Sequence, residues 1–186
     1  MHALDLTDHF LIAMPSLQDP NFSKTVTYIC AHNEEGAMGI VINRPLDLSL
    51  GEVLNQMDLE PGDEDISGQT VYHGGPVHTD RGFILHRPGN AWSSTLPVTS
   101  NVAVSTSRDI LGAISNGTGP QDVLVALGYA GWGSGQLENE MSNNAWLSGP
   151  ADLNIVFSTA PGDRWRTAAL LLGVDVESIS HDVGHA

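Results

Sequence analysis

The residues best suited to binding chemistry follow an apolar segment at 123–127, whose composition is that of a buried strand. Four glycines come directly after it, at positions 128, 131, 133 and 135. Side chains that can hydrogen-bond to a ligand or stack on it follow, namely Gln136, Glu138, Asn144 and Trp146. A glycine turn between a strand and a helix lets backbone amides approach a ligand closely. The pattern predicts a pocket for a small polar or cationic ligand, and a tight corner of packed backbone is the alternative.

This segment matches none of the better-known phosphate-binding or nucleophile loops. The dinucleotide fingerprint fails because Gln136 stands where the third glycine belongs, and the P-loop fails because no Gly-Lys-Ser/Thr is present. Ser134 is flanked by Trp132 and Gln136, where a nucleophile elbow requires glycines. Glu138 and Glu140 near the start of the expected helix would also oppose a bound phosphate.

Cationic side chains are scarce in this chain, which makes their positions informative. There are six arginines and a single lysine, Lys24. Arg44 follows Asn43 at the end of an expected strand, and Arg81 lies beyond the Gly74-Gly75-Pro76 bend. A guanidinium in such a place could bind a carboxylate of a ligand. A structural ion pair with one of the 22 aspartate and glutamate residues is the alternative.

The expected ligand-binding set combines these regions and comprises Asn43, Arg44, Gly74, Gly75, Arg81, Gly131, Trp132, Gly133, Gln136, Glu138, Asn144 and Trp146. For these residues to act together, the bend at 74–76 and the segment at 131–136 must lie side by side. They must also leave an opening that side chains of the later segment can line. No catalytic residue, metal ligand or cofactor is assigned.

The histidines and the single cysteine give weaker signals. His73, His78 and His86 lie near one expected hairpin, but no carboxylate or cysteine completes a zinc-binding pattern. We expect these three to be polar surface residues. Cys30 and His32 share one face of an expected strand, yet a lone cysteine among apolar neighbours is expected in the core.

The elements that must position these residues mix strands and helices irregularly. A capping box, Ser49 with Glu52, predicts the first helix, with Leu48 and Val53 as its hydrophobic staple. Other helices are expected from 106, from 134 to 141, and from 161 to 172. Strands are expected at 25–32, 37–43, 70–73, 82–86, 102–105, 123–127 and 154–157. Because strict β-α-β alternation is missing, the fold class is α+β.

Composition excludes several classes of protein. A length of 186 residues predicts one domain over 1–186, and the net charge of −15 would repel nucleic acid and anionic membrane. No run approaches the ~18 apolar residues of a membrane span. The N-terminal segment contains Asp5 and Asp8 and lacks the basic start of a signal peptide. We therefore expect a cytoplasmic protein.

Several strings resemble one known family. They are FLIAMPSLQDPNFSKTVTYICAHNEEGAMGIVINRP at 10–45, YHGGPVHTDRGFILH at 72–86, STSRDIL at 105–111, LGYAGWGSGQLENE at 127–140, NAWL at 144–147 and the closing GHA. Over essentially its whole length the sequence resembles the AlgH/YqgE family of bacterial proteins. The resemblance implies a single α+β domain with a mixed, mostly antiparallel, bifurcated sheet that curls toward a pseudo-barrel and carries flanking helices.

For function the resemblance implies little, since most members are uncharacterised and it supplies no catalytic residues. Some members carry the label of transcriptional regulator, through a link to exopolysaccharide (alginate) synthesis. The sequence has no helix-turn-helix with a basic second helix, so any such influence is expected to be indirect.

Three hypotheses about function follow. The leading one is a non-catalytic regulatory or accessory domain that binds a small polar ligand or a protein partner. The second is an unrecognised enzyme of hydrolase type that uses Glu138 or His73 as a base. The third is a pure protein-interaction module with a flat exposed apolar patch. Oligomeric state is not predicted.

Overall fold

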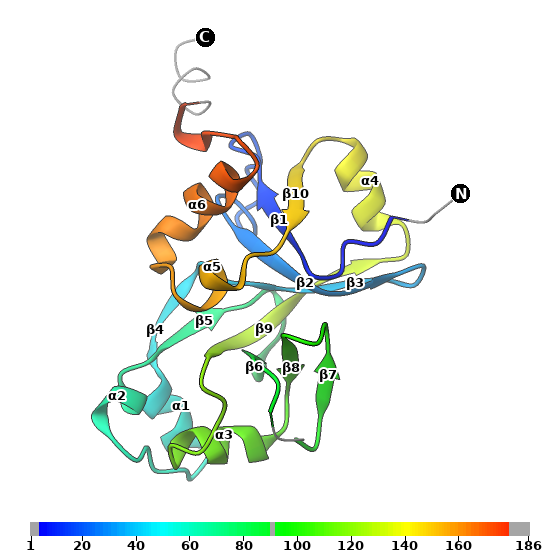
Figure 1. The fold of residues 1–186 in the computed structure, drawn as a ribbon. Coiled ribbons are helices and arrows are strands. Elements are labelled where there is room, and N and C mark those ends of the chain that lie inside the picture. Colours follow the sequence, from blue (N-terminus) through cyan, green and yellow to red (C-terminus); the bar gives the residue numbers. More distant parts are fainter. Residues whose placement is uncertain (1–3, 90–91, 179–186) are drawn as a thin grey trace.

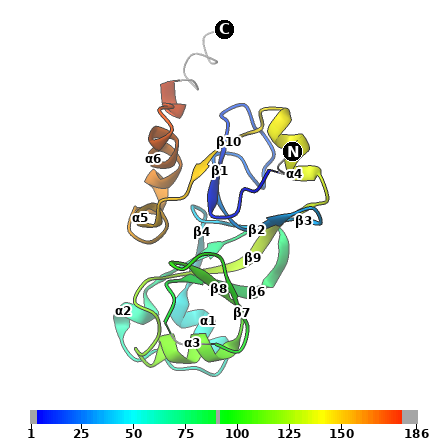
Figure 2. The ribbon, with the colours of Figure 1, turned by 45° about the vertical axis from the view of Figure 1, so that its right-hand side comes forward.

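The long strand β9 (Val123–Gly133) is the centre of the fold. A computed structural model describes residues 4–89 and 92–178. The first half of β9 pairs with β6 (Val77–His86) antiparallel and with β5 (Thr70–His73) parallel. Its second half pairs antiparallel with β3 (Gly36–Val41). The sheet therefore branches at β9, and the views in Figures 1 and 2 show β9 passing between the two parts of the molecule.

The remaining strands extend both branches. The order along the main path is β10-β1-β2-β3-β9-β6-β8-β7, with β4 paired to β5. Their bounds are β1 His9–Ala13, β2 Val26–Asn33, β4 Pro45–Ser49, β7 Thr95–Pro97, β8 Ala103–Ser105 and β10 Trp146–Pro150. Every pairing is antiparallel except that of β5 with β9. The expected α+β class with a mixed, mostly antiparallel, bifurcated sheet is confirmed.

Helices cover both parts of the sheet. The helices α1 (Leu50–Gln56) and α3 (Arg108–Ser115) pack in one apolar cluster with residues of β5, β6 and β9, and α2 (Glu64–Ser67) lies next to α1. On the other side of β9 lie α4 Gln136–Ser142, α5 Leu153–Phe157, the 3-10 turn η1 Pro161–Asp163 and α6 Arg164–Leu171. Over the described residues, no helix combines the length and the apolar character that crossing a bilayer requires.

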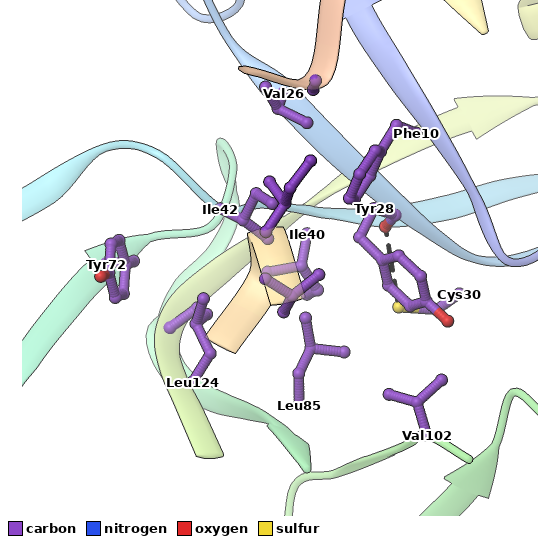
Figure 3. Packing of buried hydrophobic residues seen from close by; sticks show 14 of the residues in the cluster. Phe10, Val26, Tyr28, Cys30, Ile40, Ile42, Tyr72, Leu85, Val102 and Leu124 are labelled. Carbon is purple, nitrogen blue, oxygen red and sulfur yellow. Dashed lines mark hydrogen bonds between the residues drawn. The ribbon is translucent and has the colours of Figure 1, made fainter. Parts of the chain in front are cut away.

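The main core lies where the two parts of the sheet face each other. Phe10, Tyr28 and Ile40 from the first strands meet Leu85 and Leu124 from β6 and β9, as Figure 3 shows. Phe10 and Tyr28 pack edge to face with ring centroids 6.4 Å apart. Smaller clusters lie under α1 and α3 and under α4. Each helix group thus covers its own apolar layer of a continuous sheet.

Cys30 lies in this main core, as expected, with 2% of its surface exposed. Burial in apolar surroundings raises the pKa of the Cys30 thiol to about 12. The thiol is therefore protonated and shielded at neutral pH, which is the opposite of a nucleophilic cysteine.

Local signals predicted some element boundaries well. The capping box of α1 is present: the Ser49 hydroxyl accepts from the Glu52 N–H, and the Glu52 carboxylate accepts from the Ser49 N–H. The expected strand at 154–157 is wrong, because this segment is the helix α5. The Asp152 carboxylate caps that helix by accepting from the Asn154 N–H. The apolar run that follows is too short to distinguish a helix from a strand by its periodicity.

The expected glycine turn is also wrong. Gly128, Gly131 and Gly133 lie inside β9, and only Gly135, with φ of +73°, forms the turn before α4. Ser134 does not cap that helix; its hydroxyl donates to the Glu34 carbonyl at 2.7 Å. The glycines act through close packing of backbones, and the strand continues through them.

Candidate functional site

The bend at Gly74 and Gly75 packs directly against residues 127–130 of β9, and backbone fills the space between them. Gly74 N–H donates to the Leu127 carbonyl at 2.8 Å, and a Cβ on Gly74 would lie 2.4 Å from the Gly128 carbonyl oxygen. A Cβ on Gly75, whose φ is +155°, would lie 2.1 Å from the Tyr129 carbonyl carbon. We call this contact the glycine seam. The close contact is with residues 127–130, which precede the expected segment at 131–136, and glycines here allow a backbone approach that any side chain would block.

Residues of β9, α4 and β10, together with Phe22 from the segment between β1 and β2, form a second unit. We call it the Glu140 cluster, and its members are Phe22, Trp132, Gly133, Gln136, Glu140 and Trp146. The indole N–H groups of Trp132 and Trp146 both donate to Glu140 Oε1, at 3.2 and 3.1 Å. Gln136 Nε2 donates to Glu140 Oε2 at 3.0 Å, and Gln136 Oε1 accepts from the Gly133 N–H at 3.0 Å.

The rings of the Glu140 cluster pack on one another. Phe22 stacks on Trp132 at 5.9 Å and meets Trp146 edge to face at 5.4 Å, while the two indoles are 6.3 Å apart. Both indole N–H groups are therefore hydrogen-bonded within the protein, and the exposed Gln136 side chain is also bonded to Glu140 and Gly133. Glu140 was not expected to be their anchor. Two buried tryptophans need acceptors for their N–H groups, and this requirement is the feature of the sequence that points to a nearby carboxylate such as Glu140.

Three further members of the expected set have local structural roles: two bind backbone groups, and one adopts a left-handed backbone conformation. Asn43 accepts from the Val26 N–H and donates to the Lys24 carbonyl, each at 2.9 Å. Arg44 donates to the Asn21 and Ser23 carbonyls at 2.7 and 2.9 Å, and burial lowers the pKa of its guanidinium. Asn144, with φ of +59°, follows the C-terminal end of α4 in the left-handed conformation that asparagine tolerates.

Three members of the expected set border a cavity of about 690 Å³, which we call the Arg81 cavity. Arg81, Gly131 and Trp132 from the expected set line it. Its other apolar walls are Ala37, Met38, Val77, Phe83, Leu96, Val104 and Tyr129, and its other polar groups are His78, Ser94 and Thr106. The cavity thus lies between β3, β6, β8 and β9, beside the short edge strand β7.

Arg81 is the principal charged group of this cavity. Its Nη2 donates to Thr106 Oγ1 at 3.3 Å, and its guanidinium carbon lies 5.9 Å from the centroid of the Phe83 ring. Over residues 4–89 and 92–178, no carboxylate forms an ion pair with it. The alternative of an ion pair with an internal acid is therefore not what the structure shows for Arg81 or for Arg44.

The other polar side chains that line the cavity are Ser94, Thr106 and His78. Ser94 Oγ and Thr106 Oγ1 are 2.9 Å apart and hydrogen-bond to each other. The His78 ring lies 5.9 Å from the Tyr129 ring, and its backbone is left-handed with φ of +48°. Tyr129 in turn packs against Phe83 at 5.2 Å. The cavity therefore combines aromatic walls with a cationic and hydroxylic end.

Glu138 lies in a different place, beside a buried histidine. The Leu6 N–H donates to His32 Nδ1 at 3.0 Å, so the proton of the neutral ring is on Nε2, which donates to Glu138 Oε1. The backbone N–H of Glu138 and this bond from His32 hold the pKa of the Glu138 carboxyl below its usual value of 4.5. A carboxylate with a lowered pKa is a weaker base, which argues against Glu138 as a catalytic base.

His73 and Glu138 do not share a site. His73 is on β5, which packs against β4 and β9, whereas α4 packs against β3, β9 and β10. His86 corrects another expectation, because it is buried and its ring nitrogens hydrogen-bond to Ser105 Oγ at 2.7 Å and to the Arg87 carbonyl at 2.9 Å. Within the described part of the chain, no three His, Cys, Asp or Glu side chains are grouped so as to hold a metal ion.

Comparisons with known proteins agree over nearly the whole chain. A family model described as AlgH-like matches residues 10–177. A UPF0301 protein of Thioalkalivibrio sulfidiphilus is 61% identical over 182 residues, which are 98% of this chain and 97% of that protein. A UPF0301 protein of Nitrosospira multiformis is 50% identical over 186 residues and is covered completely.

Solved structures give the same result. The solution structure of the AlgH protein from Pseudomonas aeruginosa has a TM-score of 0.81 at 51% identity, covering 97% of this chain and 95% of that one. A crystal structure of a Corynebacterium diphtheriae protein shares the fold, with a TM-score of 0.69 at 20% identity over 90% and 87% of the two chains. The chain belongs to the AlgH-like (UPF0301) family.

Proposed function

We propose that this protein is a non-catalytic regulatory or accessory domain that binds a small organic anion in the Arg81 cavity. The observation that carries the proposal is a guanidinium without an acidic partner among the described residues, at one end of an apolar cavity. Arg44, Arg108 and Arg164 also lack an acidic partner among the described residues, but each donates to backbone carbonyls. Arg81 instead donates to the Thr106 hydroxyl, which leaves more of its donors available to a ligand.

The volume and lining support a small ligand. Binding cavities for small molecules span roughly 300–1,000 Å³ and are mostly apolar with a few polar groups. The Arg81 cavity, at about 690 Å³, lies within this range. Phe83 and Tyr129 line the cavity with aromatic rings that can pack on an aromatic or aliphatic body, whereas the Trp132 ring packs in the Glu140 cluster.

The polar end supports a carboxylate as the charged group. Arg81 presents a planar fork that matches a carboxylate, and its hydrogen bond to the Thr106 hydroxyl is long, at 3.3 Å. Ser94 and Thr106 can rotate their hydroxyls to donate to a bound oxygen. Of the twelve expected residues, we propose Arg81, Gly131 and Trp132 as contacts of this ligand.

A catalytic role is less well supported. The ionisable side chains that line the Arg81 cavity besides Arg81 are His78 and Tyr129. Among the described residues, no hydroxyl or thiol nucleophile is hydrogen-bonded to the His78 ring. Glu138 belongs to a separate pocket and has a lowered pKa. Binding without turnover is therefore the simpler proposal.

The test uses 3-phenylpropionate as the probe and its uncharged amide, 3-phenylpropanamide, as the matched ligand. Titration followed by ¹H–¹⁵N NMR should give saturable shifts at Arg81, Tyr129 and Trp132 for the acid and at least about tenfold weaker binding for the amide. Arg81→Met should weaken binding of the acid by about tenfold or more. Arg166→Met removes the same charge from an exposed site on α6 and should leave binding unchanged.

Equal affinity for the acid and the amide would contradict the proposed role of Arg81. Shifts that avoid the cavity, or identical affinity in Arg81→Met and Arg166→Met, would contradict the proposed site.

A further inference from the structure

A second guanidinium, that of Arg164, lies in the interior on the opposite branch of the sheet. Arg164 is the first residue of α6 and only 4% of its surface is exposed. Its Nε–H donates to the Thr159 carbonyl at 2.9 Å, and its Nη1 donates to the Ile42 carbonyl. The guanidinium carbon also lies 5.0 Å from the centroid of the Tyr72 ring.

These contacts leave part of the guanidinium unused. The group has five N–H donors, and two of them make the bonds just given. In the described chain, Thr27 Oγ1 and Trp92 Nε1 are the fully buried side-chain atoms without a partner, so Nη2 of Arg164 reaches accessible space. That space is a cavity of about 270 Å³ that Arg164 lines.

The charge of Arg164 is not balanced by a direct ion pair. No carboxylate of the described residues pairs with it. Asp122 is the carboxylate that lines the same cavity, and it is bound to Arg87 Nε at 2.8 Å. Arg87 neutralises Asp122, so the positive charge of Arg164 has no counter-charge among these three side chains. Such a charge is costly to bury unless a partner of opposite sign arrives.

The rest of the cavity rim consists of neutral hydrogen-bonding groups. Gln69, Thr70 and Gln121 are exposed residues of the rim and carry two amides and a hydroxyl. Amide N–H and hydroxyl groups donate readily to oxyanions, and a fork of guanidinium donors fits either a carboxylate or a phosphate.

We propose that this cavity, separate from the Arg81 cavity, is a binding site for a small oxyanion, with Nη2 of Arg164 as its principal donor and the rim amides as secondary donors. The bound oxyanion completes the charge balance at the junction of α6, β5 and β9. The site therefore couples anion binding to the attachment of α6.

The experiment titrates the full chain with sodium phosphate, and in a second arm with sodium acetate, against sodium chloride at matched ionic strength. Spectra of arginine Nε–Hε groups should show a saturable shift of Arg164 and none of Arg166. At a tenfold excess of anion over its Kd, the melting temperature should rise by about 3 °C. A response to either salt supports the proposal.

Variants at the rim keep the test valid even if Arg164 variants fail to fold. Gln121→Glu places a carboxylate beside Arg164 with almost no change of shape and should weaken anion binding by at least about tenfold. Gln18→Glu makes the same change of charge at an exposed position in another loop and should leave it unaltered. Responses equal to that of sodium chloride, or equal Kd values for Gln121→Glu and the unmodified protein, would overturn the proposal.

Discussion

The Glu140 cluster and the Arg81 cavity share β9 and share Trp132, yet they differ in how their polar groups are used. In the cluster, one carboxylate accepts from two indoles and one amide, so the donors of these side chains are satisfied inside the protein. In the cavity, Arg81 has one long hydrogen bond to a hydroxyl and no acidic partner over the described ranges. Aromatic and polar residues near glycines therefore form either a closed structural unit or an open binding site. Internal hydrogen bonding distinguishes the two.

This difference predicts two classes of variant. Removing a group from the Glu140 cluster exposes a buried donor without an acceptor, which lowers the free energy of unfolding. Removing Arg81 from the cavity leaves its hydroxyl neighbours near solvent and changes binding with little effect on stability. Trp132 is the residue at which both effects should appear together.

The largest expected effect is at the glycine seam, on which both regions depend. Gly75→Ala adds a Cβ where 2.1 Å separates its position from the Tyr129 carbonyl carbon, so the two backbones must separate. We expect the free energy of unfolding to fall by about 3–5 kcal/mol, measured by denaturant titration.

Gly112→Ala is the matched control for the seam. Gly112 is in α3 and an added Cβ there meets nothing within 4 Å, so alanine should stabilise the helix by up to about 1 kcal/mol. A tolerated Gly75→Ala would show that the seam is not the rigid junction described above.

A somewhat smaller effect is expected in the Glu140 cluster. Glu140→Leu leaves the N–H groups of Trp132 and Trp146 without their acceptor and should lower the free energy of unfolding by about 2–4 kcal/mol. Glu140→Gln keeps one acceptor oxygen and should lower the free energy of unfolding by about 1 kcal/mol. Affinity for 3-phenylpropionate, measured on the folded Gln variant, should remain close to that of the unmodified protein. Equal stability of the Leu and Gln variants would remove the structural role assigned to the cluster.

The smallest effect concerns Glu138, two residues before Glu140 but with 39% of its side chain exposed. The pKa of its carboxyl is lowered in the folded protein, so its contribution to stability is present above the unfolded pKa and lost as pH falls through the folded pKa. Between about pH 5 and pH 3, Glu138→Gln should therefore lose less stability than the unmodified protein does. Glu60→Gln, in an exposed loop, is the control and should follow the unmodified protein. Identical slopes for Glu138→Gln and Glu60→Gln would show that the bond to His32 contributes nothing.

Local sequence signals were sufficient where the chemistry is local. The capping box of α1 and the hairpin of β2 and β3 depend on residues close in sequence, and both were predicted. β1 and β10 were missed because they pair with each other across most of the chain. The sequence of α5 predicts a strand as readily as a helix, because a short apolar run fits both periods.

The candidate site was predictable only in part. Arg81 and Trp132 were identified from composition and from neighbouring glycines, and both line the cavity. Phe83 and Tyr129 were missed because only the register of β6 on β9 brings them together. The role of Arg164 depends on the Ile42 carbonyl, 122 positions away in sequence, and no local pattern could reveal it.

The most direct test of the central claim is the measurement of intermolecular NOEs between 3-phenylpropionate and the protein. Binding in the Arg81 cavity predicts NOEs from the ligand ring to the side chains of Val77, Phe83 and Tyr129. It also predicts that these NOEs disappear in Arg81→Met at the same ligand concentration. NOEs confined to other surfaces, or an undiminished set in Arg81→Met, would contradict the assignment of this cavity as an anion-binding site.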